Sequence, residues 1–383
     1  MGPRPRPEVE LLDSCVHGGI RPAELRSYGV DPRTVLDFSS NTNPLGPPFD
    51  PAELLAASVE RYPDPAAEEL RHALARARGV TPEEVFVGNG AAELIRLISI
   101  AYLGPGDRAL VLEPTFGEYA YSCRLMGATV VACRGAAERE FAPDIEEVLA
   151  LVRRHQPRLI FLCQPNNPTG HYLQRDEVSA ILAAAPGLVV LDEAYVNFVE
   201  GAWPSTSLLP AGNLMILRSM TKDYALAGLR LGYVVAPREA VTALAKVAPP
   251  WNVNALAQRA GILALKSEGY LERSRRLVRE VLGVLRGGLE ALGLRALPSR
   301  SNFFLVEVGD GRLFREALLR RGILVRDCAS FGLPAYVRIA ARPLEECRRL
   351  LSAVAEVVRG GTVPTARQTS AGHGRAPWDP LGP

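Results

Sequence analysis

The chain has 383 residues, of which 48% are hydrophobic and 22% are charged, with 34 glycines and 31 prolines. This length and apolar content exclude a disordered chain or a disulfide-stapled miniprotein, and they predict about two domains or one large α/β unit. The net charge is only +2 and the basic residues are scattered, so we do not expect nucleic acid as a partner.

Membrane insertion, secretion and metal binding are also not expected. The sequence has no apolar run of membrane-spanning length, and its first ten residues lack the apolar core of a signal peptide. We therefore expect a cytoplasmic protein. The six cysteines form no CxxC pair and have no histidine at zinc-ligand spacing, which predicts neither a disulfide framework nor a metal site.

Short apolar runs alternate with amphipathic segments through the first two thirds of the chain. Buried strands joined by crossover helices predict a mainly parallel α/β sheet. The expected strands are 85–88, 109–114, 129–133, 159–163, 188–193, 214–219 and 232–236. Beyond Trp251, long charged helices followed by short strands indicate a smaller α+β domain.

These patterns predict four segments. An N-terminal segment (1–48) is expected to pack with the small domain. The large α/β domain would cover 49–270 and the small α+β domain 271–359. The remaining residues, 360–383, are rich in glycine, proline and polar residues, which is typical of a disordered tail.

Polar or small residues follow several of the expected strands, where the loops of a parallel sheet build its site. The turn from Gly90 to Ala92 opens a helix, which favours an anion at the helix N-terminus. Asn167 lies in the proline-rich turn after 159–163, and a carboxylate and a phenol, Asp192 and Tyr195, end the strand 188–193. Each of these features alone is also typical of an ordinary loop.

Lysine is rare, with only Lys222, Lys246 and Lys266 among the 44 basic residues. An amine can lose its proton and attack a carbonyl, whereas a guanidinium cannot. Lys222 differs from the other two because it follows a strand, and Ser219 and Arg230 beside it can bind a phosphate. An anion cradle, a carboxylate, a phenol and an amine form a set complementary to pyridoxal 5'-phosphate.

The order of the motifs NPTG, DEAY and SMTK, with an arginine eight residues after the lysine, resembles the aspartate-aminotransferase fold (fold type I) of pyridoxal-phosphate enzymes. The resemblance runs from about residue 15 to 358 and implies a large domain with a mainly parallel sheet plus a smaller α+β domain. It also implies that Lys222, Asp192 and Tyr195 are catalytic. The implied cofactor-binding residues are Gly90, Ala91, Ala92, Phe116, Asn167, Asp192, Tyr195, Ser219, Lys222 and Arg230.

The same resemblance implies a homodimer with shared sites. Tyr62, in the segment RYPDP, resembles the tyrosine that reaches the cofactor phosphate in the neighbouring subunit. The implied substrate is a small phosphorylated amino acid or amine. Its expected contacts are His17, Asn43, Asn167, Arg326 and Arg338.

Two reactions compete within this branch. The segments at 17–19, 250–258 and 322–328 resemble threonine-phosphate decarboxylases of cobalamin biosynthesis, so the expected reaction is decarboxylation of L-threonine O-3-phosphate to (R)-1-amino-2-propanol O-2-phosphate. The alternative is a histidinol-phosphate-type aminotransferase. Ile20 stands where the decarboxylase pattern usually has asparagine, and the segment 225–233 resembles the aminotransferase more closely. A catalytically silent regulator and a binding module are further alternatives of other classes.

Overall fold

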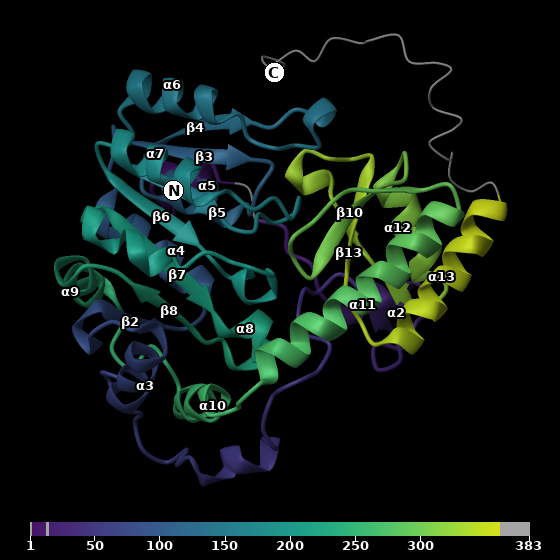
Figure 1. The fold of residues 1–383 in the computed structure, drawn as a ribbon, viewed down its shortest axis with the longest axis horizontal. Helices are drawn as coiled ribbons and strands as arrows, with labels where there is room; N and C mark the ends of the chain where they lie inside the picture. The colour runs from purple at the N-terminus through teal and green to yellow at the C-terminus, as the bar shows by residue number, and fades with distance from the viewer. Residues whose placement is uncertain (1, 13–14, 361–383) are drawn as a thin grey trace.

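The structure is a computed structural model that describes residues 2–12 and 15–360. Two units lie side by side, each with its own sheet and hydrophobic core, and one long helix connects them (Figure 1). The large unit contains a seven-stranded sheet in the order β2-β8-β7-β6-β5-β3-β4. The small unit contains a four-stranded sheet in the order β12-β13-β10-β9.

The strands of the large sheet lie within one residue of the predicted bounds at each end. They are β2 (Val85–Gly88), β3 (Arg108–Glu113), β4 (Thr129–Arg134), β5 (Leu159–Cys163), β6 (Leu188–Asp192), β7 (Leu214–Ser219) and β8 (Gly232–Val235). Strands β4, β3, β5, β6 and β7 are parallel, while β8 runs antiparallel to both β7 and β2. The prediction of a mainly parallel α/β fold is confirmed.

Helices cover both faces of this sheet, because alternate side chains of each strand point to opposite faces. In β5, Ile160 and Leu162 belong to one core, and Leu159 and Phe161 belong to the other. The first core packs against α3 (Glu68–Arg78), α6 (Ile145–His155), α7 (Arg175–Ala184) and α10 (Ala255–Leu265). The second packs against α4 (Ala91–Tyr102), α5 (Glu118–Leu125) and α9 (Arg238–Val247).

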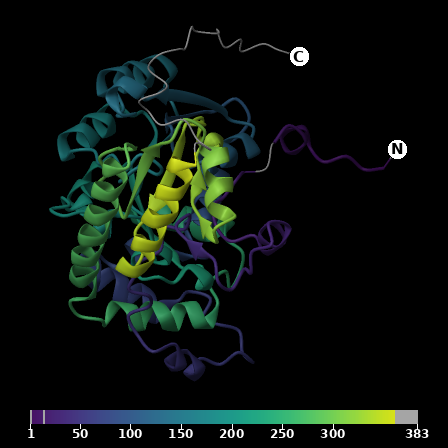
Figure 2. The same ribbon diagram turned by 90° about the vertical axis from the view of Figure 1, so that its right-hand side faces the viewer.

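The small unit is an antiparallel sheet covered by three helices. Its strands are β9 (Arg295–Ala296), β10 (Phe303–Glu307), β12 (Arg326–Asp327) and β13 (Tyr336–Ala340). Its helices are α11 (Tyr270–Ala291), α12 (Gly311–Leu319) and α13 (Leu344–Arg359), whose apolar faces form one core with the sheet. Figure 2 shows α13 lying across this unit. At 22 residues, α11 is long enough to reach from the large unit to the small one.

The N-terminal segment contacts the small unit through backbone and side chains. It contains α1 (Pro7–Glu10), α2 (Pro22–Ser27) and β1 (Leu36–Asp37), and β1 pairs in parallel with β11 (Ile323–Leu324). Phe38 is fully buried in the core of the small unit. The domain boundaries stay predictions, and residues 361–383 of the predicted tail lie outside the described residues.

Short 3₁₀ helices and one four-residue helix complete the chain. They are η1 (Pro51–Ala56), η2 (Pro82–Glu84), η3 (Ala137–Arg139), η4 (Val196–Phe198), η5 (Ser205–Ala211), η6 (Ala227–Leu229), η7 (Ala329–Phe331) and α8 (Met220–Asp223). Among the described helices, none is both long and apolar enough to cross a membrane. The cytoplasmic location stays a prediction.

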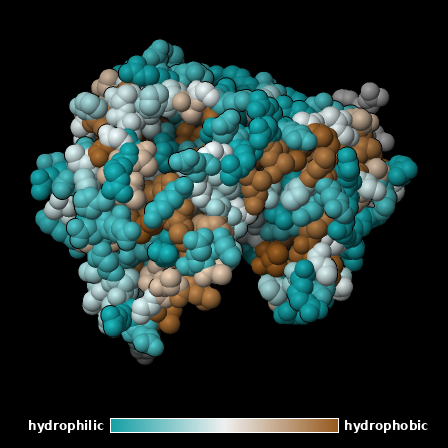
Figure 3. Space-filling model, turned by 60° about the horizontal axis from the view of Figure 1, so that its bottom comes forward, coloured by the Kyte–Doolittle hydropathy of each residue, from teal (hydrophilic) through white to brown (hydrophobic). Residues whose placement is uncertain are grey.

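The segment around η1 extends from the bottom of the large unit in Figure 1 and carries exposed apolar side chains. Leu55, Val59 and Tyr62 are each about four-fifths exposed, and Trp251 beside them is 44% exposed. Figure 3, which brings this side of the molecule forward, shows apolar residues gathered on it and a hollow between the two units. Such a patch is typical of a surface that another chain covers.

Candidate active site

A cavity of about 490 Å³ lies between the carboxyl ends of the central strands and the small unit. Its walls come from three parts of the chain that are distant in sequence: the loops after the sheet strands, the N-terminal segment, and β12 and β13. The lining includes most of the predicted site residues, namely His17, Ala91, Ala92, Phe116, Asn167, Asp192, Tyr195, Ser219, Lys222, Arg230, Arg326 and Arg338.

One end of the cavity is built to bind an anion. The N-terminus of α4 begins at Ala91, directly after Gly90, whose φ of +83° favours glycine. A Cβ at Gly90 would lie 2.9 Å from a guanidinium nitrogen of Arg230, so only glycine allows Arg230 to approach the helix N-terminus. The Ser219 hydroxyl lies 2.7 Å from that of Thr221. Helix N–H groups, hydroxyls and a guanidinium together match a phosphate.

Lys222 projects from α8, the short helix that follows β7. The Ser219 hydroxyl caps this helix by accepting a hydrogen bond from the Thr221 N–H. Within the described residues, the ammonium of Lys222 makes no hydrogen bond or ion pair, and it borders the cavity. Burial, together with the positive charges of Arg338 and Arg230, lowers the pKa of Lys222 to about 8.

Asp192 ends β6 and is almost fully buried. One of its oxygens accepts from the Ala194 N–H at 2.9 Å and the other from the Tyr119 hydroxyl at 2.6 Å. Burial raises the pKa of Asp192 to about 6, although both hydrogen bonds oppose that rise. The carboxylate is therefore oriented, and it is charged at neutral pH.

Tyr119 is a site residue that sequence reasoning missed. It lies in the first turn of α5, is fully buried, and stacks on Phe161 with ring centroids 4.8 Å apart. Its position three residues after Phe116 in the motif EPTFGEY was the available signal. The sequence could not reveal its partner, because Asp192 is 73 residues away.

The aromatic wall and the amide lie where the resemblance implies. Phe116 borders the cavity and meets Tyr119 edge to face at 5.7 Å. The Tyr195 hydroxyl accepts from the Asn41 side chain at 3.2 Å, and burial raises the pKa of Tyr195 to about 12. The Asn167 side chain, 5% exposed, accepts a hydrogen bond from the Arg338 guanidinium.

Two buried arginines form the other end of the cavity. Arg326 and Arg338 are register partners on β12 and β13, and they are 6% and 5% exposed. Arg326 donates to the Val16 carbonyl and the Ser330 hydroxyl, and Arg338 donates to the Ser39 carbonyl. Neither guanidinium makes an ion pair with a carboxylate within the described residues, and Nε of Arg338 has no hydrogen-bond partner there. Burial lowers the pKa of both.

His17 borders the same cavity and pairs with Glu118, another residue that sequence reasoning missed. Nε2 of His17 lies 2.9 Å from Oε1 of Glu118. Contacts with Cys15 and Glu118 raise the pKa of His17 to about 9. The N-terminal segment thereby brings a positive charge to the mouth of the cavity.

Three predicted site residues do not line this cavity: Gly90, which directly precedes the N-terminus of α4, Asn43 and Tyr62. The side chain of Asn43 donates to the Asp223 carbonyl and to the Ser274 hydroxyl, and its N–H donates to the Lys222 carbonyl. Asn43 therefore supports the backbone behind Lys222. Tyr62 is exposed, stacks on Trp251 at 4.4 Å, and lies outside the cavity of its own chain.

The geometry fits pyridoxal phosphate. The anion cradle, the lysine amine, the buried carboxylate and the aromatic wall face a single cavity, and the cradle would be filled by a Cβ at Gly90. The cavity also has two separate places for anions, because the phosphate cradle belongs to the large unit and the arginine pair belongs to the small unit. A second anionic group can therefore bind beside the first.

Comparisons with known proteins also indicate a pyridoxal-phosphate enzyme of the aminotransferase type. The sequence profile of the family "Aminotransferase class I and II" matches residues 33–354. The chain is 36% identical over 367 residues to histidinol-phosphate aminotransferase 2 of Pseudomonas aeruginosa, covering 92% of this chain and 97% of that protein. It is 39% identical over 328 residues to the histidinol-phosphate aminotransferase of Symbiobacterium thermophilum, covering 84% and 90%.

Solved structures agree. The chain is similar to the histidinol-phosphate aminotransferase of Sinorhizobium meliloti in complex with pyridoxal-5'-phosphate, with a TM-score of 0.85, 26% identity, and coverage of 94% of this chain and 99% of that one. A Thermus thermophilus aspartate aminotransferase double mutant gives a TM-score of 0.76 at 27% identity, with coverage of 93% and 100%. The predicted fold and cofactor, pyridoxal phosphate, are confirmed.

The prediction of a threonine-phosphate decarboxylase, and with it a lyase of cobalamin biosynthesis, is wrong. The curated relatives described above and the Sinorhizobium meliloti structure are all named histidinol-phosphate aminotransferases. The segments behind that prediction build the frame of the site. Asn254 caps α10, Gly322 precedes β11 at a φ of +74°, and Arg326 lies on β12. A helix cap and a turn of this kind are needed whichever bond of the substrate breaks.

Proposed function

We propose, because the chain belongs to the class I and class II aminotransferase family, that it transfers the amino group of a phosphorylated amine of the histidinol-phosphate type to a 2-oxo acid. The names of the relatives support the amine and the reaction. The main structural support for a phosphorylated substrate is a pair of buried guanidinium groups, Arg326 and Arg338. They face the cavity without a carboxylate partner among the described residues. Buried charges of this kind are costly unless an anion pairs with them.

The cofactor end has a simple division of tasks. Pyridoxal phosphate, when bound, supplies an aldehyde for the amine and a ring that withdraws electrons from the substrate Cα. Asp192 holds a proton on the ring nitrogen, and Tyr119 keeps that carboxylate oriented. Arg230, Ser219 and the N-terminus of α4 bind the phosphate. Tyr195 donates to the phenolic oxygen of the ring.

Lys222 moves the proton on which the reaction depends. Its lowered pKa, about 8, leaves a useful fraction of the amine uncharged near neutral pH, as a general base requires. With the cofactor bound, its Nζ would hold the aldehyde group. As an uncharged amine at the cavity wall, Lys222 would also be the group placed to accept the proton from the substrate Cα and to hold it for return.

The substrate end fixes which bond faces Lys222. Two guanidinium groups side by side on β12 and β13 bind the substrate phosphate, and so they limit rotation about the bonds to Cα. Asn167 accepts a hydrogen bond from Arg338 and also belongs to the cofactor set. This contact links the position of the substrate phosphate to that of the ring.

We also propose a homodimer with shared sites. Tyr62 lies outside the cavity of its own chain, on the exposed apolar segment around η1. Arg230 is exposed in the single chain. A second chain that covers the segment around η1 would bury its apolar side chains, and the Tyr62 phenol of each chain would reach the phosphate cradle of the other.

The test is a substrate panel with purified holoenzyme and a 2-oxo acid, followed by mass spectrometry of the amino acid formed. We expect kcat/KM to be highest with histidinol phosphate and at least about 30-fold lower with the unphosphorylated alcohol. L-threonine O-3-phosphate should release no CO₂. Equal rates with and without the phosphate, or no amino transfer to any phosphorylated amine, would contradict the proposal.

A further inference from the structure

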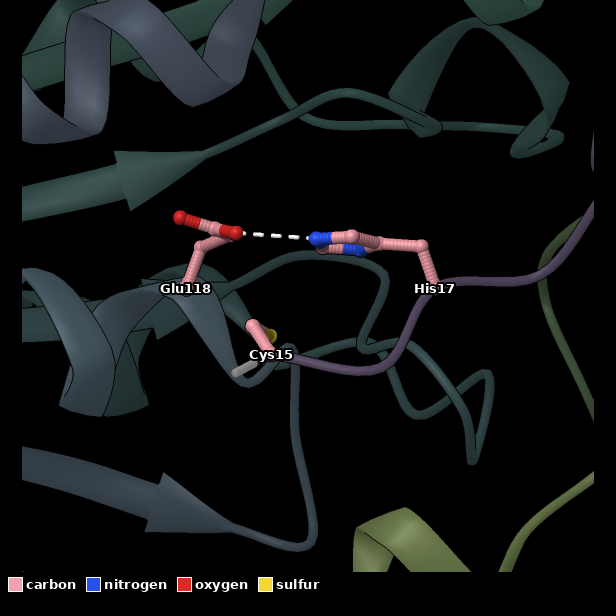
Figure 4. A group of neighbouring side chains, drawn as sticks. All are labelled: Cys15, His17 and Glu118. Atoms are coloured by element: carbon pink, nitrogen blue, oxygen red, sulfur yellow. Dashed lines mark hydrogen bonds and ion pairs between the residues drawn. The ribbon is translucent and has the colours of Figure 1, made fainter. Parts of the chain in front are cut away.

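Three side chains of different chemistry meet at the mouth of the cavity, as Figure 4 shows. Cys15 and His17 come from a short strap of the N-terminal segment, residues 15–19, and Glu118 comes from the first turn of α5. The thiol sulfur, a ring nitrogen and a carboxylate oxygen all lie within 4.8 Å of one another. The proposed amino transfer uses neither Cys15 nor Glu118.

This group has the chemistry of a zinc site. Zinc takes thiolate, imidazole and carboxylate ligands at about 2.0–2.3 Å, so neighbouring ligands of a tetrahedral ion lie about 3.3–3.8 Å apart. Small rotations of the exposed His17 and the partly exposed Cys15 side chains toward Glu118 bring the three atoms from within 4.8 Å to that spacing. The sequence predicted no metal site, because Glu118 is 101 residues from His17.

Two further observations point to a cation. Glu118 is only 3% exposed, and its Oε1 pairs with His17. Its Oε2 accepts no hydrogen bond among the described residues and is held only by an ion pair with the partly exposed Arg96 at 3.6 Å. Cys15 lies against Gly117, where a Cβ would be 2.9 Å from the sulfur. A glycine at that place leaves room for the Cys15 sulfur beside the N-terminus of α5.

We propose that Cys15, His17 and Glu118 bind one Zn²⁺ ion per chain, with its fourth position open to the cavity. The thiol and the imidazole bind after releasing their protons to solvent, and Glu118 binds as the carboxylate. Three protein ligands and one open position are typical of zinc sites that also hold water or a substrate group. Magnesium, which prefers oxygen ligands, does not compete.

Zinc at this place controls access to the active site. Val16, His17 and Gly18 line the cavity, and the His17 ring lies 5.8 Å from that of Phe116. An ion that joins the strap to α5 holds it across the cavity mouth and takes His17 away from the substrate. Zinc is therefore a competitive inhibitor toward the amino donor, an effect that rests on the proposed function.

The experiment measures zinc itself. Holoenzyme freed of metal by a chelator is dialysed against buffered zinc, and bound metal is counted by elemental analysis. We expect one zinc per chain with a Kd below about 1 μM, and a Kd at least about tenfold higher for Cys15→Ser, in which the partly exposed thiol alone is changed. With cobalt instead, wild type shows a thiolate-to-metal charge-transfer band that Cys15→Ser lacks.

A matched control is His72→Ala, because His72 and Glu68 form an exposed histidine–carboxylate pair at 3.9 Å without a thiol. Its zinc affinity should equal that of wild type. Failure of wild type to bind zinc at micromolar free metal, or equal affinity in wild type and Cys15→Ser, overturns the proposal. Since binding is measured without turnover, these results are independent of whether the chain is an aminotransferase.

Inhibition is measured as the apparent KM for the amino donor with and without zinc, each variant being compared with its own zinc-free rate. At a free zinc concentration above the Kd of wild type and below that of Cys15→Ser, we expect zinc to raise this KM in wild type and to leave it nearly unchanged in the variant. A fall in kcat at constant KM would overturn the assignment of the strap as the element that the metal closes.

Discussion

The two ends of the cavity are built in different ways. The cofactor end consists of residues at or just beyond the carboxyl ends of strands in one sheet, such as Asp192 at the end of β6 and Lys222 on α8, which follows β7. The substrate end is assembled from the N-terminal strap, α5 and two strands of the small unit. One end therefore depends on local order in the sequence, and the other depends on how two units pack.

This difference separates the chemistry from the specificity. Groups carried by a single sheet keep their spacing whatever the small unit does, so they can perform a step common to many substrates. Groups on the small unit and the strap can change without disturbing that step. The same division implies that mutations at the cofactor end stop the reaction, while mutations at the substrate end change which amine is accepted.

The largest expected effect is at the cofactor end. Lys222→Ala should lower kcat by more than about 10⁴-fold and abolish the visible absorbance of lysine-bound cofactor, because no other amine borders the cavity within the described residues. Lys222→Arg is the control: it keeps the charge but cannot release a proton, so it should be equally inactive. A Lys222→Ala enzyme that keeps both properties would refute the assignment.

At the substrate end, Arg338→Ala should cost about 2–4 kcal/mol in kcat/KM for the phosphorylated donor, or roughly 30- to 1000-fold, with little change for the unphosphorylated alcohol. Steady-state kinetics with both donors measure the contrast. Arg326→Ala provides a second test, because Arg326 contacts the strap and Ser330 and makes no hydrogen bond to the cofactor residue Asn167. Equal losses with both donors would place these arginines outside the phosphate site.

Tyr119→Phe tests the orientation of the carboxylate. Asp192 has a pKa of about 6, so cofactor affinity should fall as pH drops through that value, because a neutral carboxyl no longer pairs with the protonated ring. Removal of the Tyr119 hydroxyl destabilises the carboxylate. The fall should begin at higher pH, and cofactor should bind about 10- to 100-fold more weakly at pH 6. Fluorescence titration from pH 5 to 8 measures this, and an unchanged profile would contradict the role of Tyr119.

The smallest effect on cofactor binding is expected from Tyr62, which we propose reaches the site of the neighbouring subunit. Tyr62→Ala should weaken cofactor binding about three- to tenfold, since Arg230, Ser219 and the α4 N-terminus still hold the phosphate. A heterodimer of Tyr62→Ala and Lys222→Ala chains should contain one site with wild-type affinity, which differently tagged chains allow us to isolate. If Tyr62 acts in its own chain, the only lysine-bearing site in that heterodimer stays weak.

Most residues predicted for the cofactor end lie together at one cavity for a physical reason. Buried strands are short apolar runs, and the loops after parallel strands necessarily lie at the same edge of the sheet. The chemistry of Asp192, Ser219, Lys222 and Arg230 could therefore be read in order. Asn43 lies behind Lys222 and does not line the cavity, and in sequence an amide beside a site looks the same as one that supports the backbone behind it.

The sequence by itself determined the fold, the cofactor and the residues of the sheet edge, because these depend on local pattern and strand order. The tertiary structure decided which distant groups meet: Tyr119 on Asp192, Arg326 beside Arg338, and Cys15 with His17 on Glu118. Each of these contacts joins elements whose relative position is set by the packing of cores. No local periodicity specifies that packing, because it is the combined result of many nonlocal contacts between α5, the small unit and the N-terminal segment.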